Sequence, residues 1–482
     1  MGYEAVIGLE VHAQLLTDSK LFCGCSAKFG ADPNSQTCPV CLGMPGVLPV
    51  LNRKVVEFAV RLGIATHCRI SSSSQLARKN YFYPDLPKGY QISMYESPIA
   101  VGGHLEIKKG DAPKRIGITR IHMEEDAGKN IHDEAVTGGK WSFVDLNRAS
   151  VPLLEIVSEP DMNTPEEAVQ YLKKLRGIVM YLGICDGNME EGSFRCDANI
   201  SVRPRGDVKL GVKTELKNIN SFKFIERALI YEIERQIETL KKGERITQDT
   251  RLFDSKKGVT YSMRTKEYAH DYRYFPEPDL LPLIMDEKWI EEIKSTLPEL
   301  PDDKYGRFIK EYQLPDYDVG IITSTRVLAD YFEECVKLFP KPKMVSNWIM
   351  TEVLRVAKKE NDIGEISIEP RDLIELFKLI DNGAISLNMA KEVFEEAYNT
   401  GTKPLQIVER KGVSQISDAD SLKTIIAEVV KNHPDQVNQY LSGKDKVLGF
   451  LVGRVMKASG GRANPQKVNE LLQKYLKGGQ QA

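Results

Sequence analysis

The sequence predicts an α+β protein in which strands come first and helices come last. Up to about residue 290, segments with apolar residues at every second position are separated by turns rich in Gly and Pro, as in a sheet with one covered face. Two amphipathic helical segments interrupt these strands, and from Trp289 onward the apolar spacing becomes helical. Strands followed by helices, rather than a regular alternation of the two, are typical of the α+β class.

The chain is longer than one hydrophobic core usually organises. With 482 residues, 41% of them hydrophobic and 28% charged, it has the composition of an ordinary globular protein with more than one domain. Changes in pattern and charge predict three domains, at residues 1–292, 293–406 and 407–482. No apolar run approaches the ~20 residues of a membrane helix, and the first residues do not form a secretion signal. We therefore expect a cytoplasmic protein with no membrane contact.

The first strand has an apolar face and a face that carries chemically active groups. Residues Ala5–Leu15 alternate without interruption, with the apolar side chains on one face and Glu10 and His12 side by side on the other. A carboxylate beside an imidazole can bind a divalent cation. A half-exposed strand with two ordinary polar residues explains the same pattern, so this strand alone leaves both interpretations open.

The two helices within the strand region have clear start and stop signals. Thr164, Pro165 and Glu167 form a capping box, and the helix that follows ends at Gly183. Ser221 begins a second helix with a continuous apolar stripe, which ends at Gly243. We expect both helices to cover the apolar face of the sheet.

Four of the eight cysteines lie close together in the sequence. A C-x-C pair is followed, after twelve residues, by a C-x-x-C pair, and the four residues are Cys23, Cys25, Cys38 and Cys41. Paired thiols on turns are typical of a zinc site with four sulfur ligands. Because such a site leaves no open position for water, the spacing favours structural zinc over catalytic zinc; free thiols are the alternative.

Further acidic residues follow the same strand pattern. Asp197 lies on the polar face of an alternating strand, Glu155 lies within an apolar strand, and Glu125 is one of three adjacent acids. A buried carboxylate needs a cation or hydrogen bonds. Ligands that are mostly oxygen suit magnesium better than zinc. The candidate set is Glu10, His12, Glu125, Glu155 and Asp197.

The sequence lacks the common phosphate-binding loops, but it has a basic and aromatic segment. Neither GxxxxGK[ST] nor a strand-linked GxGxxG occurs. The segment QLARKNYFYPDLPKGYQIS places Arg78, Lys79 and Lys88 among tyrosines, a combination suited to phosphates and to stacked rings. Lys79 is therefore a further catalytic candidate, whereas the residues that contact a nucleotide base cannot be named.

The last residues form a basic segment on a chain whose formal net charge is −2. Between residues 444 and 477, eight Lys or Arg face only two acids. This local excess suits contact with a phosphate backbone, although a solvated helix face explains it equally well. The candidate residues are Lys444, Lys446, Arg454, Lys457, Arg462 and Lys467.

Several motifs resemble one known family along nearly the whole chain. The strings GLEVH, CPVCLGMPGVLP, HMEEDAGK, VDLNR, LLEIVSEPD, EEGSFRCDANISVRP, ELKNINSF and DYRYFPEPDL resemble those of the GatB family, the B subunits of the aspartyl/glutamyl-tRNA(Asn/Gln) amidotransferases. The tail string GFLVGRVMKASGGRANPQKVNELL extends the resemblance to the end of the chain.

The resemblance implies a fold and a reaction. It implies a cradle like that of glutamine synthetase on a largely antiparallel sheet, then a helical domain and a small helical tail related to the YqeY family. It implies magnesium at His12, Glu125 and Glu155, with Glu10 and Asp197 at the same centre around a second ion. ATP would phosphorylate the side-chain carboxylate of Glu or Asp mischarged on tRNA(Gln) or tRNA(Asn), and ammonia would then displace the phosphate.

The resemblance also implies partners. This chain lacks the Gly/Ser-rich amidase signature, so the ammonia would come from a separate amidase-type glutaminase subunit, in a heterotrimer that also contains a small third subunit. The basic tail would contact the tRNA, and zinc would be structural. The alternative from another class is a zinc-containing tRNA-binding scaffold without catalytic activity.

Overall fold

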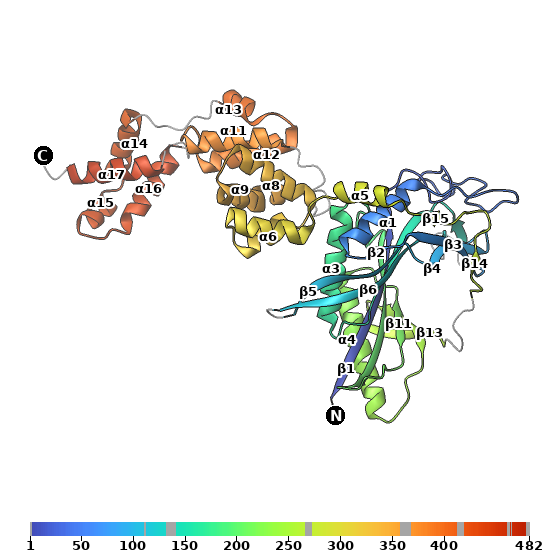
Figure 1. Ribbon diagram of the computed structural model, residues 1–482. Coiled ribbons are helices and arrows are strands. Elements are labelled where there is room, and N and C mark those ends of the chain that lie inside the picture. The colour runs from blue at the N-terminus through green and yellow to red at the C-terminus, as the bar shows by residue number, and fades with distance from the viewer. Residues whose placement is uncertain are drawn as a thin grey trace. The chain divides into compact units, whose positions relative to one another are not determined.

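A large, mostly antiparallel sheet dominates the first part of the computed structural model (Figure 1). The structure describes residues 2–109, 112–131, 141–265, 272–356, 368–411, 419–459, 463 and 465–478. The chain divides into two compact units, with the boundary between Pro301 and Asp302. The sheet belongs to the first unit and the helical region to the second, which confirms the predicted α+β class.

The strands of the sheet follow the order β13-β12-β11-β10-β1-β9-β6-β4-β3-β14, with β5 also paired to β6. The path runs antiparallel except between β11 and β12. The strands are β1 (Tyr3–Gln14), β2 (Arg69–Ile70), β3 (Ser73–Asn80), β4 (Tyr90–Ser97), β5 (Ala100–Lys109), β6 (Ala112–Glu125), β9 (Pro152–Ser158), β10 (Phe194–Pro204), β11 (Thr214–Lys217), β12 (Asp249–Asp254), β13 (Val259–Thr265), β14 (Phe275–Pro276) and β15 (Leu283–Ile284). A separate two-stranded sheet pairs β7 (Lys129–Ile131) with β8 (Phe143–Asp145).

The strand predicted from the alternation lies in the middle of the sheet. β1 pairs with β10 on one side and with β9 on the other. Its apolar residues are almost completely buried in the first core, from Ile7 to Ala13. Both faces of the alternation are therefore as the sequence predicts, and the polar face of β1 lies at the centre of the sheet.

Helices cover the apolar face of this sheet. Helices α3 (Pro165–Tyr181) and α4 (Phe222–Lys241) begin where they were predicted, because the side chains of Thr164 and Ser221 accept hydrogen bonds from the backbone N–H groups of Glu167 and Phe224. Gly183 and Gly243, which follow the helices, have the positive φ of C-terminal caps. Figure 1 shows both helices running along the sheet. Helix α1 (Arg53–Ala65), which was not predicted, packs against the same core.

Where the structure describes it, the second unit consists of helices around two separate hydrophobic cores. One core extends from Phe308 to Ile407 and the other from Leu422 to Leu476. The helices are α6 (Pro301–Tyr312), α7 (Asp316–Ile322), α8 (Arg326–Leu338), α9 (Pro342–Trp348), the π-helix η1 (Ile349–Val353), α10 (Leu354–Val356), α11 (Pro370–Asp381), α12 (Leu387–Thr400), α13 (Pro404–Lys411), α14 (Ala419–Asn432), α15 (Pro434–Leu441), α16 (Val447–Ala458) and α17 (Pro465–Gly478).

Both predicted domain boundaries fall inside helices. The boundary at residue 292 lies in α5 (Glu287–Ser295), which packs on the first core through Ile293. The boundary at residue 406 lies in α13, whose Ile407 is buried in the second core. Both boundaries were placed where the sequence pattern changed, and each of these helices belongs to the core that precedes it. Among the described residues, no helix has the length and apolar character needed to cross a membrane.

Candidate functional site

A row of charged side chains crosses the centre of the sheet on its polar face. The strand register pairs His12 of β1 with Glu155 of β9 on one side and with Arg195 of β10 on the other. Glu155 in turn pairs with His122 of β6. Because paired residues of neighbouring strands point to the same face, the register alone brings these four side chains together.

Three of the side chains on this face converge on one point. The Nε2 atom of His12 lies 3.4 Å from a carboxylate oxygen of Glu124 and 3.4 Å from one of Glu155. One donor atom from each of the three lies within 4.8 Å of the other two. All three side chains are largely shielded from solvent. We call this group the His12 cluster.

The electrostatics of the His12 cluster are those of a cation site. Burial lowers the pKa of His12, but the hydrogen bonds to Glu124 and Glu155 outweigh burial and raise this pKa to about 10. Although burial alone would raise the pKa of Glu155, His122 and His12 hold it well below its usual range. In the metal-free chain a proton on His12 thus compensates the two carboxylates. A metal ion, which binds the neutral imidazole, would compete with this proton.

The structure brings Glu124, rather than the expected Glu125, into the His12 cluster. The two residues are neighbours in β6, so their side chains point to opposite faces of the sheet. Glu125 points into the protein, where it forms an ion pair with Lys88 and accepts hydrogen bonds from the Ser150 hydroxyl and, at 2.8 Å, from the Ile92 N–H. Each oxygen of its carboxylate therefore has a protein partner.

Glu10 and Asp197 lie next to the His12 cluster but outside it. They pair directly across β1 and β10. Glu10 accepts a 2.8 Å hydrogen bond from Asn199, and Asp197 accepts one of 2.6 Å from Lys217. Glu10 and Asn199 also line a pocket of about 210 Å³ that opens on this face. The two carboxylates could belong to a second cation position beside the first.

The donor atoms fit magnesium. One carboxylate oxygen of Glu124 is buried and has no hydrogen-bond partner among the described residues, which is costly unless a cation or water binds there. Two carboxylates and one imidazole are mostly hard donors, as magnesium prefers. The His12 cluster therefore has suitable ligands for a divalent cation that keeps open coordination positions.

Aromatic and cationic side chains flank the His12 cluster. Tyr95 stacks on Tyr274 with ring centroids 5.3 Å apart, and the Arg120 guanidinium lies 4.3 Å from the Tyr95 ring. The predicted Lys79 lies on the same face through its pairing with Gln91, and its ammonium is 5.1 Å from the ring of Tyr272.

Sequence reasoning missed several members of this site: Glu124, Arg120, His122, Arg195 and Lys217. Period-two alternation could have found Glu124 and His122, because they occupy alternate positions of one strand. Arg195 and Lys217 emerge only from the strand register.

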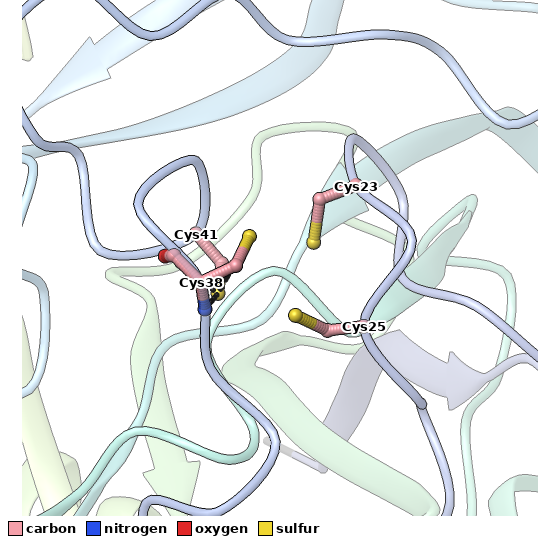
Figure 2. Close-up of side chains that lie close together, drawn as sticks. All are labelled: Cys23, Cys25, Cys38 and Cys41. Carbon is pink, nitrogen blue, oxygen red and sulfur yellow. Dashed lines mark hydrogen bonds between the residues drawn. The ribbon is translucent and has the colours of Figure 1, made fainter.

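The four predicted cysteines form a second cluster (Figure 2). Cys23 and Cys25 come from one loop and Cys38 and Cys41 from another, and the four sulfur atoms lie within 4.8 Å of one another. A hydrogen bond from Cys23 lowers the pKa of Cys41 to about 4 despite burial, with help from the Cys38 N–H and Lys20. Burial and a hydrogen bond with Cys38 raise the pKa of Cys25 to about 11. This geometry fits a metal ion with four thiolate ligands, which we call the cysteine site.

The predicted basic residues of the tail lie on or beside α16 and α17 and are exposed, except that Arg462 lies outside the described residues. Arg454 lies over the ring of Phe450 at 4.9 Å, and Phe450 also meets His433 edge to face. An exposed aromatic ring beside an arginine suits contact with nucleic acid, and it suits a solvated surface equally well.

Comparisons with known proteins agree with this arrangement. Residues 5–291, which contain the His12 cluster and the cysteine site, match the family model of the GatB/GatE catalytic domain, and residues 330–476 match that of the GatB domain. The chain belongs to the GatB family. This finding confirms the resemblance drawn from the motifs.

Members of the GatB family match this chain over its whole length. The aspartyl/glutamyl-tRNA(Asn/Gln) amidotransferase B subunit of Thermodesulfovibrio yellowstonii is 60% identical over 478 residues, 99% of this chain and 100% of the relative. Those of Geotalea uraniireducens and Geobacter sulfurreducens are 60% and 58% identical, each over 479 residues, with the same shares. As their name states, these relatives are subunits of a larger enzyme.

Proposed function

We propose that this chain activates and amidates the side-chain carboxylate of Glu or Asp mischarged on tRNA. ATP phosphorylates the carboxylate, ammonia displaces the phosphate, and the products are Gln-tRNA(Gln) or Asn-tRNA(Asn). The observation that carries this proposal is the His12 cluster, whose hard donors include a buried carboxylate oxygen without a protein partner among the described residues. The relatives' names, which state this amidotransferase class, support the same reaction.

The His12 cluster would hold the catalytic magnesium. His12, Glu124 and Glu155 are its ligands, and Glu10 and Asp197 hold a second ion. Bound magnesium would neutralise the charge of the transferred phosphoryl group. Lys79, Arg120 and Lys217, on the same face, bind phosphate oxygens.

A carboxylate is a poor acyl donor because oxide is a poor leaving group. Phosphorylation converts that oxygen into a good leaving group, so activation and amidation can take place at one position on the sheet. Strands β1, β6 and β9 keep the ligand side chains fixed, because β1 pairs regularly with β9 from Glu10 to Gln14 and β6 does so from Arg120 to Glu125.

The remaining parts of the proposal concern partners and zinc. An amidase-type glutaminase subunit supplies the ammonia, a small third subunit completes the heterotrimer, and the complex acts in the cytoplasm. The cysteine site holds a structural zinc ion, because four thiolates leave no position for a reacting water. The basic tail contacts the tRNA.

The test is Glu124→Gln in the reconstituted complex. This substitution keeps the shape of the side chain but removes a charged metal ligand. We expect it to abolish ATP-dependent conversion of Glu-tRNA(Gln) to Gln-tRNA(Gln), while tRNA binding and glutamine hydrolysis by the partner persist. Product formation is measured by separating the amino acids released from the tRNA.

The matched control is Glu106→Gln, because Glu106 is an exposed carboxylate on β5 of the same sheet. It should leave conversion unchanged. Full conversion by the Glu124→Gln complex would refute the metal assignment and favour the scaffold alternative.

A further inference from the structure

Lys20 is a fully buried lysine beside the cysteine site. Its exposed fraction is 0%, which is rare for a charged side chain. Its ammonium Nζ lies 3.7 Å from the sulfur of Cys41 and donates a 2.8 Å hydrogen bond to the carbonyl oxygen of Gln36. Nothing in the proposed reaction uses this residue.

We propose that Lys20 is the counter-charge of the cysteine site and a donor that orients the Cys41 thiolate. Lys20 is a positioning residue, since it contacts a ligand of the site rather than the metal itself. The inference rests on the proposed four-thiolate metal site.

The cysteine site balances the charge of Lys20. A buried ammonium is costly unless a negative group compensates it. Within the described part of the chain Lys20 forms no ion pair with a carboxylate; its side-chain partners are a neutral carbonyl and the Cys41 sulfur. A thiolate is therefore the anion that this lysine faces. A divalent ion with four thiolates carries two negative charges, and one buried ammonium halves that charge.

Lys20 lies between the two halves of the cysteine site. Its backbone N–H donates a 2.9 Å hydrogen bond to the carbonyl of Cys25, in the C-x-C loop. Its side chain reaches Cys41, in the C-x-x-C loop. The residue thus contacts both loops that supply ligands.

The carbonyl that accepts the hydrogen bond from Lys20 is itself held in place. The backbone N–H of Gln36 donates a 2.8 Å hydrogen bond to the side chain of Asn147, whose amide donates one of 2.7 Å to the carbonyl of Asp32. The ammonium is therefore held by an acceptor of fixed position. The Cys41 sulfur accepts a second hydrogen bond, of 3.1 Å, from the backbone N–H of Cys38. Hydrogen bonds of this kind to a metal ligand typically change metal affinity by about 10- to 100-fold.

The experiment measures metal binding by the full-length chain, with no activity assay. Cobalt(II) replaces zinc, and the sulfur-to-cobalt absorption bands report on the four-thiolate site while a chromophoric chelator competes for the ion. We expect Lys20→Met, which removes the charge but keeps an unbranched side chain, to weaken binding about 10- to 100-fold. Lys20→Arg, which keeps the charge, should bind cobalt within a few-fold of the wild type.

A second neutral variant and a control complete the design. Lys20→Gln is polar but has no charge, and it should lose affinity as Lys20→Met does; it decides the question if the Met variant does not fold. Lys28→Met removes an exposed lysine from the same loop and should bind cobalt like the wild type.

Wild-type affinity in the neutral variants would overturn the role of Lys20. A wild-type chain that shows no sulfur-to-cobalt bands would instead overturn the metal site itself. The two failures are therefore distinguishable.

Discussion

At the scale of single residues, one step along a strand separates two different roles. Glu124 points to the polar face, where one of its oxygens lacks a partner among the described residues, whereas Glu125 points into the protein and is fully paired. The same chemical group is therefore a candidate ligand at one position and part of the folded core at the next. Substitutions at the two positions should separate these roles.

Glu125→Gln should destabilise the first unit. It leaves the ammonium of Lys88, which is only 9% exposed, without its counter-charge. We expect a loss of about 3 kcal/mol in the free energy of unfolding, because breaking a buried ion pair strands the remaining charge. Urea unfolding in the presence of a chelator measures it.

Glu124→Gln is the natural comparison in the same experiment. Without metal it should change stability by less than about 1 kcal/mol, since Glu155 remains beside His12 and the repulsion between the two carboxylates is removed. Equal stability of the Glu125→Gln variant and the wild type would show that Lys88 finds another partner or water.

The sequence predicted the face on which Glu10 and His12 lie, because alternation is a local property of one strand. It also predicted the four cysteines, whose spacing is local. The sequence did not separate Glu124 from Glu125, because three adjacent acids do not show where the strand ends. Lys20 and Lys217 could not be predicted, because their partners come from loops and strands whose register depends on the whole fold.

At the scale of elements, the residues at helix ends predicted the helices better than the residues inside them. The caps of α3 and α4 were predicted because Thr164 and Ser221 bond to backbone groups three residues away. Helix α1 was missed; its N-cap is Asn52. The π-helix η1 was not predicted either. It carries Glu352, a buried carboxylate held by Lys391 at 2.7 Å and by Arg355 at 3.2 Å.

Glu352 should make the stability of the second unit depend on pH. Burial alone would raise the pKa of Glu352, but hydrogen bonds from Lys391 and Arg355 lower this pKa below the ordinary value of 4.5. Between these two pKa values the unfolded chain binds a proton that the folded chain does not. The stabilisation is therefore complete above about pH 4.5 and is lost as the pH falls through the folded pKa.

Glu352→Gln should cost about 1–2 kcal/mol at neutral pH. The difference in the free energy of unfolding between this variant and the wild type should shrink as the pH falls below the ordinary pKa of glutamate. Urea unfolding at several pH values measures this difference. A difference that stays constant down to about pH 3 would mean that the carboxylate charge does not stabilise the fold.

At the scale of the whole molecule, separate cores decide where the chain can be cut. The sequence indicated three regions because hydrophobic pattern and charge change along the chain, and the described part of the structure contains three hydrophobic cores. The exact limits depend on which core each helix joins, and that information lies in tertiary packing. Ile407 illustrates this, because it follows the predicted boundary yet is completely buried in the preceding core.

Removal of the residues after Lys411 should therefore test the tail without damage to the rest. This cut keeps α13 whole and removes the third core together with the basic residues of α16 and α17. We expect the reconstituted complex to bind tRNA more weakly, with a smaller slope of log affinity against log salt, because fewer phosphate contacts release fewer counterions. Glutamine hydrolysis by the partner should persist.

A cut after residue 406, which removes Ile407, should in addition destabilise the second core by about 2–4 kcal/mol. Unchanged affinity at low salt after the cut at Lys411 would show that the basic residues form only a solvated surface, since a phosphate contact must weaken when its cation is removed.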